Sequence, residues 1–156
     1  MSPLTEGSKA PDFSMPTHLG YSICRSELEG KKFILYFYPK ADTSGCTKEA
    51  CAFEEHQSQF KKMNVSIIGV SRDPIQKLEA FAKKYSLTFP LASDAHGTVT
   101  EAYGVWVEKS MYGKKYMGIE RTTFLINEKG IILKRWPKVK VSGHVEAVLE
   151  TVKRFN

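Results

Sequence analysis

The sequence predicts an α/β protein in which helices cover both outer faces of a mixed central sheet. Two apolar runs, 32–39 and 65–73, suit strands that are buried on both faces, and each is followed by a segment with helical spacing of its apolar residues. Segment 121–136 then indicates two strands around an Asn-Glu-Lys-Gly turn, and an amphipathic helix over 142–155 closes the chain. Strands that alternate with helices and end in a hairpin and a helix are typical of this class.

Each element has a local signal. The first strand, KFILYFYP, stops at a proline, and the helix after it has small or apolar residues at 46, 50, 53, 60 and 63. The helix over 74–87 has a proline in its first turn. We expect a short strand at 89–92 and a short helix at 96–103. Segment 104–120 lacks a clear period and has three glycines, so we expect a long surface loop there.

Length and composition indicate one soluble domain over residues 1–156. A chain of 156 residues can bury an adequate core, and 42% hydrophobic with 26% charged residues is ordinary for a globular protein. We find no signal peptide and no apolar stretch near the roughly 18 residues that span a bilayer. The three cysteines do not form a disulfide framework. We therefore expect a cytoplasmic protein with reduced thiols and no membrane role.

The basic charge balance raises the question of an anionic partner. The formal net charge is +6 and the isoelectric point is near 9.2. However, the lysines and arginines are dispersed beside apolar elements, as expected for solvated rims and helix faces, and no nucleic-acid-binding motif accompanies them. We expect no nucleic-acid partner.

The stretch YPKADTSGCTKEAC, residues 38–51, contains two cysteines five positions apart, which could be structural, metal-binding or reactive. A structural zinc site needs about four ligands at paired short spacings, whereas the four histidines are scattered singly, at His18, His56, His96 and His144. Packing as a small apolar residue remains a fair alternative for Cys51. We expect no metal site.

The position of Cys46 favours a reactive thiol. If Thr43 or Ser44 is the N-cap, Cys46 lies in the first helical turn, where free amide groups and the helix dipole favour a thiolate. On an ideal helix, five residues separate the Cα atoms of Cys46 and Cys51 by roughly 8.6 Å, beyond the approximately 7 Å limit for a disulfide. A bond between them would require the first turn or more to unwind.

The same stretch resembles the peroxiredoxins, specifically the Q-type or bacterioferritin comigratory protein subfamily. Pro39, Thr43 and Cys46 form its P-x-x-x-T-x-x-C pattern, with Cys51 five residues on. Further similar segments follow in order, among them GSKAPDFSMP, SRDPIQKLEAFAKKYSLTFPLASD and GVWVEKSMYGKKYMGIERTTFLI. The resemblance covers most of the chain and implies a thioredoxin-like fold with an N-terminal extension. Ser44 departs from the pattern, since many relatives have proline there.

The resemblance also implies an activity and a set of site residues. The reaction would be reduction of hydrogen peroxide and organic hydroperoxides without metal or organic cofactor, as antioxidant defence. Cys46 would be the peroxidatic cysteine, oxidised to sulfenic acid. Arg121 would stabilise its thiolate and the departing oxygen. Thr43 would hydrogen-bond the peroxide while capping the helix, and Pro39 would shield the thiolate from water.

The remaining roles concern Glu49 and the other two cysteines. Glu49 would help to orient Arg121. Cys51 would resolve the sulfenic acid as an intramolecular disulfide, which thioredoxin or a similar dithiol protein would reduce. Cys24 is expected to be structural, although it could instead resolve Cys46 or form an intermolecular bond. Such proteins are often monomers. A thiol–disulfide oxidoreductase acting on proteins is the rival enzyme, but it would normally carry C-x-x-C.

Overall fold

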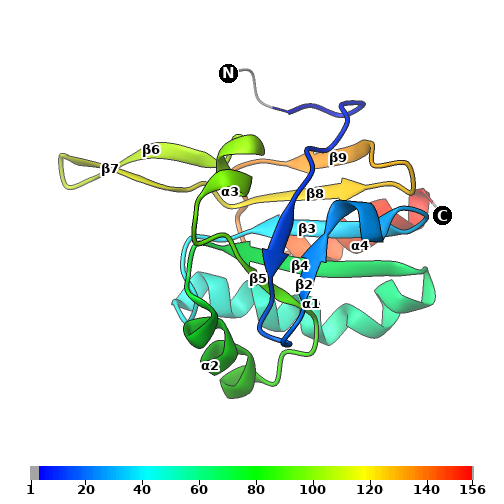
Figure 1. Cartoon of the computed structure of the whole chain (residues 1–156), viewed down its shortest axis with the longest axis horizontal. Helices are drawn as coiled ribbons and strands as arrows, with labels where there is room; N and C mark the ends of the chain where they lie inside the picture. Colours follow the sequence, from blue (N-terminus) through cyan, green and yellow to red (C-terminus); the bar gives the residue numbers. More distant parts are fainter. Residues whose placement is uncertain (1–3, 156) are drawn as a thin grey trace.

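A five-stranded mixed sheet forms the centre of the protein in the computed structural model, which describes residues 4–155. Its spatial order is β5-β4-β3-β8-β9 (Figure 1). The strands are β3 (Lys32–Phe37), β4 (Val65–Ser71), β5 (Leu91–Ser93), β8 (Thr122–Ile126) and β9 (Ile132–Trp136). β3, β4 and β5 are parallel, whereas β8 is antiparallel to both β3 and β9. The predicted mixed sheet and its terminal hairpin are confirmed.

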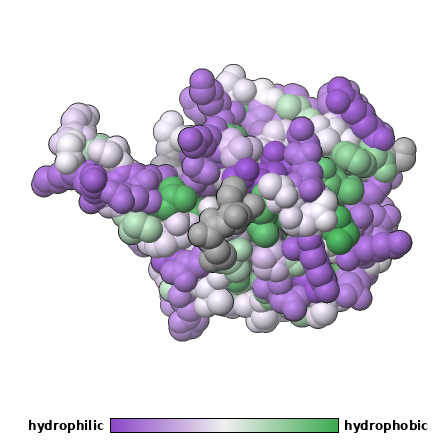
Figure 2. Space-filling model, turned by 90° about the horizontal axis from the view of Figure 1, so that it is seen from above, coloured by the Kyte–Doolittle hydropathy of each residue, from purple (hydrophilic) through white to green (hydrophobic). Residues whose placement is uncertain are grey.

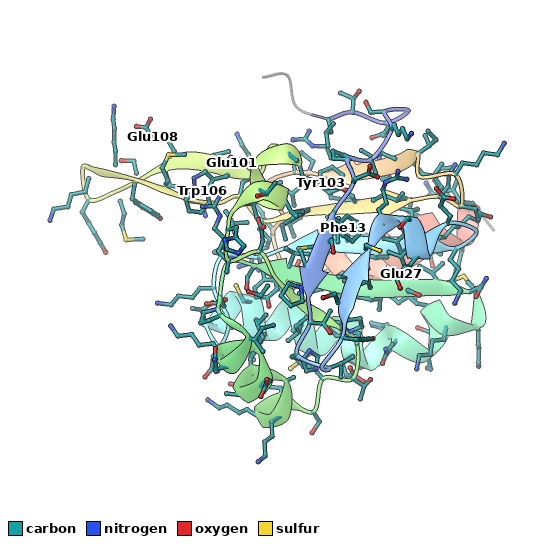
Figure 3. The ribbon with its side chains drawn as sticks, in the orientation of Figure 1. Phe13, Glu27, Glu101, Tyr103, Trp106 and Glu108 are labelled. Carbon is teal, nitrogen blue, oxygen red and sulfur yellow. The ribbon has the colours of Figure 1, made fainter. Side chains whose placement is uncertain are left out.

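Helices and short elements cover both faces of this sheet, as predicted. One face packs against three helices, α1 (Ser44–Lys62), α2 (Ile75–Tyr85) and α4 (His144–Arg154). The opposite face carries β1 (Ser14–Pro16), β2 (Ser22–Cys24), the 3-10 helix η1 (Arg25–Leu28) and α3 (Thr98–Ala102). On that second face Phe13 and Tyr103 lie close together, with ring centroids 6.4 Å apart (Figure 3). Two hydrophobic cores therefore hold the sheet between them.

The central strand β3 explains why its sequence is apolar without alternation. Tyr36 faces α1, where its ring stacks on Phe53 at 4.6 Å, while Phe37 faces the other core and meets Phe124 edge-on. Because both faces of β3 are covered, neighbouring residues are equally buried. Each such large side chain contributes about 1.5–3 kcal/mol by leaving water. This strand fixes the position of the loop that follows it.

The expectation of a surface loop over 104–120 is wrong, because this segment forms a hairpin. β6 (Trp106–Met111) pairs antiparallel with β7 (Lys114–Ile119), and Tyr112 and Gly113 make the turn. Both turn residues have positive φ, 52° and 79°, which suits a two-residue hairpin connection. The hairpin extends from the body with hydrophilic side chains along it (Figure 2). Because most of the hairpin is solvated on both faces, its sequence lacks the alternation that marks a half-buried strand.

The base of the hairpin packs against the rest of the protein through Trp106. The guanidinium of Arg72, which follows β4, lies 3.3 Å from the centroid of the Trp106 ring. Arg72 also lies 3.9 Å from the carboxylate of Glu101 of α3, which is labelled with Trp106 in Figure 3. A cation over an indole face contributes about 0.5–2 kcal/mol. The hairpin root is thereby held beside the sheet edge where β4 ends.

Candidate active site

The candidate site lies at the sheet edge where β3 and β4 end and β8 begins. Phe37 pairs with Thr122, so Arg121, one residue before β8, sits beside the chain as it turns from β3 into α1. The carboxyl ends of parallel strands meet at one edge, and here the antiparallel β8 adds its start to the same edge. Residues distant in sequence therefore converge on the first turn of α1.

Cys46 lies in that first turn, as the sequence predicts. Thr43 is the N-cap, with extended backbone (φ −95°, ψ 160°), and its carbonyl accepts the first helical hydrogen bond, from the amide of Thr47 at 2.8 Å. Cys46 is 1% exposed. Its sulfur therefore lies in the first turn of α1, at the positive end of the helix dipole, and is largely shielded from water.

Arg121 bridges Cys46 and Glu49. Its Nη2 donates to the Sγ of Cys46 at 3.3 Å, and its Nη1 donates to Oε1 of Glu49 at 2.7 Å. One guanidinium can do this because its donors form a rigid planar fork. Glu49 is fully buried, and burial raises the pKa of this carboxyl to about 7 although Arg121 opposes the rise. The predicted contact of Glu49 with Arg121 and the convergence of Arg121 on Cys46 are both present.

The loop before α1 places Thr43 and Pro39 at the rim of the site. Thr43 is the N-cap, as the sequence predicts, but its hydroxyl does not cap the helix: Oγ1 donates instead to the carbonyl of Lys40 at 2.9 Å. The cause is local, since the loop turns back tightly and brings that carbonyl within reach. Pro39 is half-buried after β3 and lines a groove of about 390 Å³ that runs toward the hairpin.

The other two cysteines are free thiols. Cys51 is half-buried within α1, on the same intact helix as Cys46, so the two cannot be bonded in this state. Burial, followed by the negative charge of Glu54, raises the pKa of Cys51. Cys24 is also half-buried and donates to the carboxylate of Glu27 at 2.7 Å, directly before η1.

Sequence reasoning missed three features of the site. A Cβ on Gly45 would lie 3.2 Å from Nη2 of Arg121, so glycine permits the close approach of the guanidinium. Asp73 holds the loop, accepting from the amide of Ala41 at 2.7 Å and the hydroxyl of Ser71 at 2.8 Å. His144, behind Glu49, was noted only as an isolated histidine. Asp73 could have been suspected, because it lies two residues after the buried strand β4, which ends at this edge.

Among residues 4–155, no group of three or more histidine, cysteine, aspartate or glutamate side chains could hold a metal ion. Within the same residues, no helix is long and apolar enough to cross a membrane.

Comparison with known proteins places this geometry in a family. The model of the AhpC/TSA family matches residues 7–135, which is most of the chain. The chain belongs to the AhpC/TSA family. A relative named putative peroxiredoxin Bcp, from Coxiella burnetii, is 54% identical over 143 residues, covering 92% of this chain and 95% of the relative. The predicted membership in the Q-type or Bcp peroxiredoxins is thereby confirmed.

Solved peroxiredoxin structures agree with this placement. A Cys-to-Ser variant of peroxiredoxin Q from Xylella fastidiosa has a TM-score of 0.94 at 34% identity, with 99% of each chain covered. A Bcp structure from Xanthomonas campestris, described by its alkyl peroxide reduction activity, has a TM-score of 0.88 at 38% identity, with 92% of this chain and 91% of that chain covered. The predicted thioredoxin-like peroxiredoxin fold and the predicted enzyme class, a thiol peroxidase, are confirmed.

Proposed function

We propose that this peroxiredoxin reduces hydroperoxides at Cys46, with Arg121 as the group that activates it. The observation that carries the proposal is the forked guanidinium of Arg121, with one nitrogen 3.3 Å from Sγ and the other on Glu49. A permanent positive charge beside a buried sulfur stabilises the thiolate, which is the nucleophilic form. The hydrogen bond from Arg121 to Glu49 holds the guanidinium in the orientation that faces the sulfur.

The first chemical step is a displacement at oxygen. The Cys46 thiolate attacks one peroxide oxygen, an S–O bond forms and the O–O bond breaks. The electron pair leaves on the other oxygen, which takes a proton to give water or an alcohol. Sulfur is oxidised to sulfenic acid while the peroxide is reduced. The donors of Arg121 and the free amides of the first turn of α1 are the groups we assign to stabilise the developing charge, and such donors supply a large part of the rate. Thr43, at the rim, is the residue we assign to align the peroxide, and Pro39 limits water.

Cys51 is the residue we assign to resolve the sulfenic acid. Its sulfur attacks that of Cys46, a disulfide forms, and the hydroxyl group leaves as water. Because both residues lie on α1, its first turns must unwind for the two atoms to meet. While the helix is intact, the raised pKa of Cys51 keeps it a thiol. Unwinding relieves its burial, so Cys51 becomes more nucleophilic as it is released.

The groove beside Pro39 favours organic hydroperoxides as substrates in addition to hydrogen peroxide. Its apolar lining comes from Trp106, Met117 and Ile119 of the hairpin. An apolar group on the distal oxygen could lie there and leave water. A solved structure of the related Xanthomonas campestris bacterioferritin comigratory protein is described by its alkyl peroxide reduction activity, and the groove in this protein suits that substrate class.

We also propose that the catalytic cycle is completed by a dithiol protein of the thioredoxin kind. It would pass two electrons and two protons to the Cys46–Cys51 disulfide, which restores both thiols. Three free thiols suit a reducing compartment such as the cytoplasm. A resolving cysteine within the same chain lets a monomer complete the cycle.

Turnover of cysteine variants tests the assignment. Cys46→Ser should abolish consumption of hydrogen peroxide. Cys51→Ser should retain one fast equivalent of oxidation but lose turnover with thioredoxin and its reductase. Cys24→Ser is the matched control and should turn over like the unaltered protein. Turnover by Cys46→Ser would refute the peroxidatic assignment, and loss of turnover in Cys24→Ser would move the resolving role to Cys24.

A further inference from the structure

A second layer of polar groups lies buried behind the Arg121–Glu49 pair. Oε1 of Glu49 accepts from Arg121, but Oε2 is also buried and has no hydrogen-bond partner among the described residues. A buried carboxylate oxygen without a partner is destabilising, so its surroundings need an explanation. The nearby imidazole nitrogen is Nε2 of His144, 4.0 Å from Oε2.

His144 is buried and contacts side chains from three other elements. It begins α4 and is 7% exposed, and its Nε2 lies 2.8 Å from the hydroxyl of Thr123. Its ring also meets the rings of Phe53 and Trp136 edge-on. Thr123 belongs to β8, two residues after Arg121. The same strand therefore positions the guanidinium on one side of Glu49 and the partner of His144 on the other.

The surroundings keep His144 neutral. Burial, and then the charge of Arg121, lower the pKa of His144 to about 4. Nε2 of this neutral imidazole makes its hydrogen bond with the hydroxyl of Thr123, so at 4.0 Å it is a polar neighbour of Oε2 rather than its hydrogen-bond partner. The titratable groups that face this cluster come from three further elements: Cys46 and Glu49 from α1, Tyr36 and Tyr38 from β3 and its exit, and Arg121 from the start of β8.

We propose that His144 is a positioning residue for peroxide reduction, which acts on Cys46 through Glu49 and Arg121. Nε2 limits the orientations open to Oε2, so the Glu49 carboxylate keeps Oε1 on Arg121 and the guanidinium keeps Nη2 on the sulfur. Thr123 fixes the imidazole in turn. This inference rests on the proposed role of Arg121 at Cys46, and it adds a residue that touches neither the sulfur nor the peroxide.

The test compares two replacements of His144 in the full-length protein. His144→Gln places an amide nitrogen near the position of Nε2, whereas His144→Phe fills the space without a polar atom. The rate constant for oxidation of Cys46 by hydrogen peroxide is measured from pH 5 to 9. We expect His144→Phe to lower it about tenfold near pH 7 and to move the acid limb of the profile, because the buried Oε2 of Glu49 then has no polar nitrogen near it. His144→Gln should stay within about threefold of the original rate.

Controls separate positioning from stability. Val148→Ala alters the same helix at a fully buried site and should lower the denaturation midpoint without moving the pH profile. In a Glu49→Gln background, His144→Phe should add less than twofold, because the residue acts through Glu49. If His144→Phe does not fold, Thr123→Val removes only the hydroxyl that fixes the ring, and it should shift the profile in the same direction.

Two outcomes would overturn the inference. One is a pH profile of His144→Phe that matches the profile of the unaltered protein. If Thr123→Val is used in place of His144→Phe, the same result with Thr123→Val would overturn the inference. The other is a full loss of rate that persists in the Glu49→Gln background, which would mean that His144 acts independently of Glu49. Neither result resembles failure of the proposed function, which would appear instead as peroxide turnover by Cys46→Ser.

Discussion

The guanidinium of Arg121 lies 3.3 Å from the sulfur of Cys46, although the two residues belong to different halves of the chain. The antiparallel pairing of β3 with β8 brings them together, because the residue before β8 falls beside the exit from β3. A fixed positive charge is thereby aimed at a buried sulfur at the start of a helix. The proposed activation of Cys46 depends on this contact.

Replacement of Arg121 tests how much the contact contributes. Arg121→Gln should lower the rate constant for oxidation of Cys46 by about a hundredfold, because removal of one preorganised donor from a charged transition state typically costs that much. Stopped-flow measurement with hydrogen peroxide gives the rate. Arg154→Gln, an exposed position on α4, serves as the control and should change the rate less than twofold. Equal rates in the two variants would remove Arg121 from the mechanism.

Gly45→Ala should separate stability from activity. Alanine is the better helix former, so the free energy of unfolding should rise by about 0.5 kcal/mol. The new methyl would lie 3.2 Å from Nη2 of Arg121, so the guanidinium must shift away from the sulfur. We therefore expect the rate of Cys46 oxidation to fall about tenfold. Urea denaturation and stopped-flow rates on the same preparation measure both effects, and an unchanged rate would show that the close approach is not required.

Glu49 and His144 should make opposing contributions to stability as pH changes. Folded Glu49 holds its proton up to a pKa of about 7 rather than 4.5, so its contribution to stability falls as pH rises across that range. Folded His144 stays neutral down to a pKa of about 4 rather than 6.5, so its contribution rises with pH across that range. The two contributions nearly cancel where the ranges overlap.

Single variants should therefore reveal slopes of opposite sign. His144→Gln leaves Glu49, and its free energy of unfolding should decrease from pH 5 to pH 7. Glu49→Gln leaves His144, and its free energy of unfolding should increase from pH 4.5 to pH 6.5. Urea denaturation at several pH values measures both, and the double variant should be the flattest of the three. Slopes of the same sign in both single variants would contradict the assigned charge states.

The groove at the base of the hairpin should affect large peroxides selectively. Met117→Glu places a charge in its apolar lining, so the rate with cumene hydroperoxide should fall about tenfold while that with hydrogen peroxide changes less than twofold. Met111→Glu, near the exposed tip of the same hairpin, is the matched control and should leave both rates unchanged. A parallel loss with both peroxides would argue against a binding groove.

The fold could be predicted where burial determines the pattern of apolar residues in the sequence. The run KFILYFYP is apolar throughout because β3 is covered on both faces, and α4 is amphipathic because it covers only one. The hairpin of β6 and β7 could not be found this way. Its residues are mostly solvated on both faces, and its turn uses Tyr112 at a positive φ rather than the usual asparagine or glycine.

The site could be predicted in part. The position of Cys46 followed from local signals, namely the strand end and the helix start that flank it. The role of Arg121 came only from family resemblance, because nothing near it in sequence indicates a contact with Cys46. His144 carries no local signal at all, since its neighbours along α4 are ordinary amphipathic residues. Its contact with Glu49 exists only because α1 and α4 pack side by side on the same face of the sheet.

The most direct measurement is peptide mass mapping after one equivalent of hydrogen peroxide, with free thiols blocked immediately afterwards. We expect a disulfide between Cys46 and Cys51 and an alkylated Cys24. In Cys51→Ser, we expect a sulfenic acid on Cys46 that dimedone traps. An alkylated, unoxidised Cys46 after this treatment, or a disulfide that joins Cys24 to Cys46, would contradict the account.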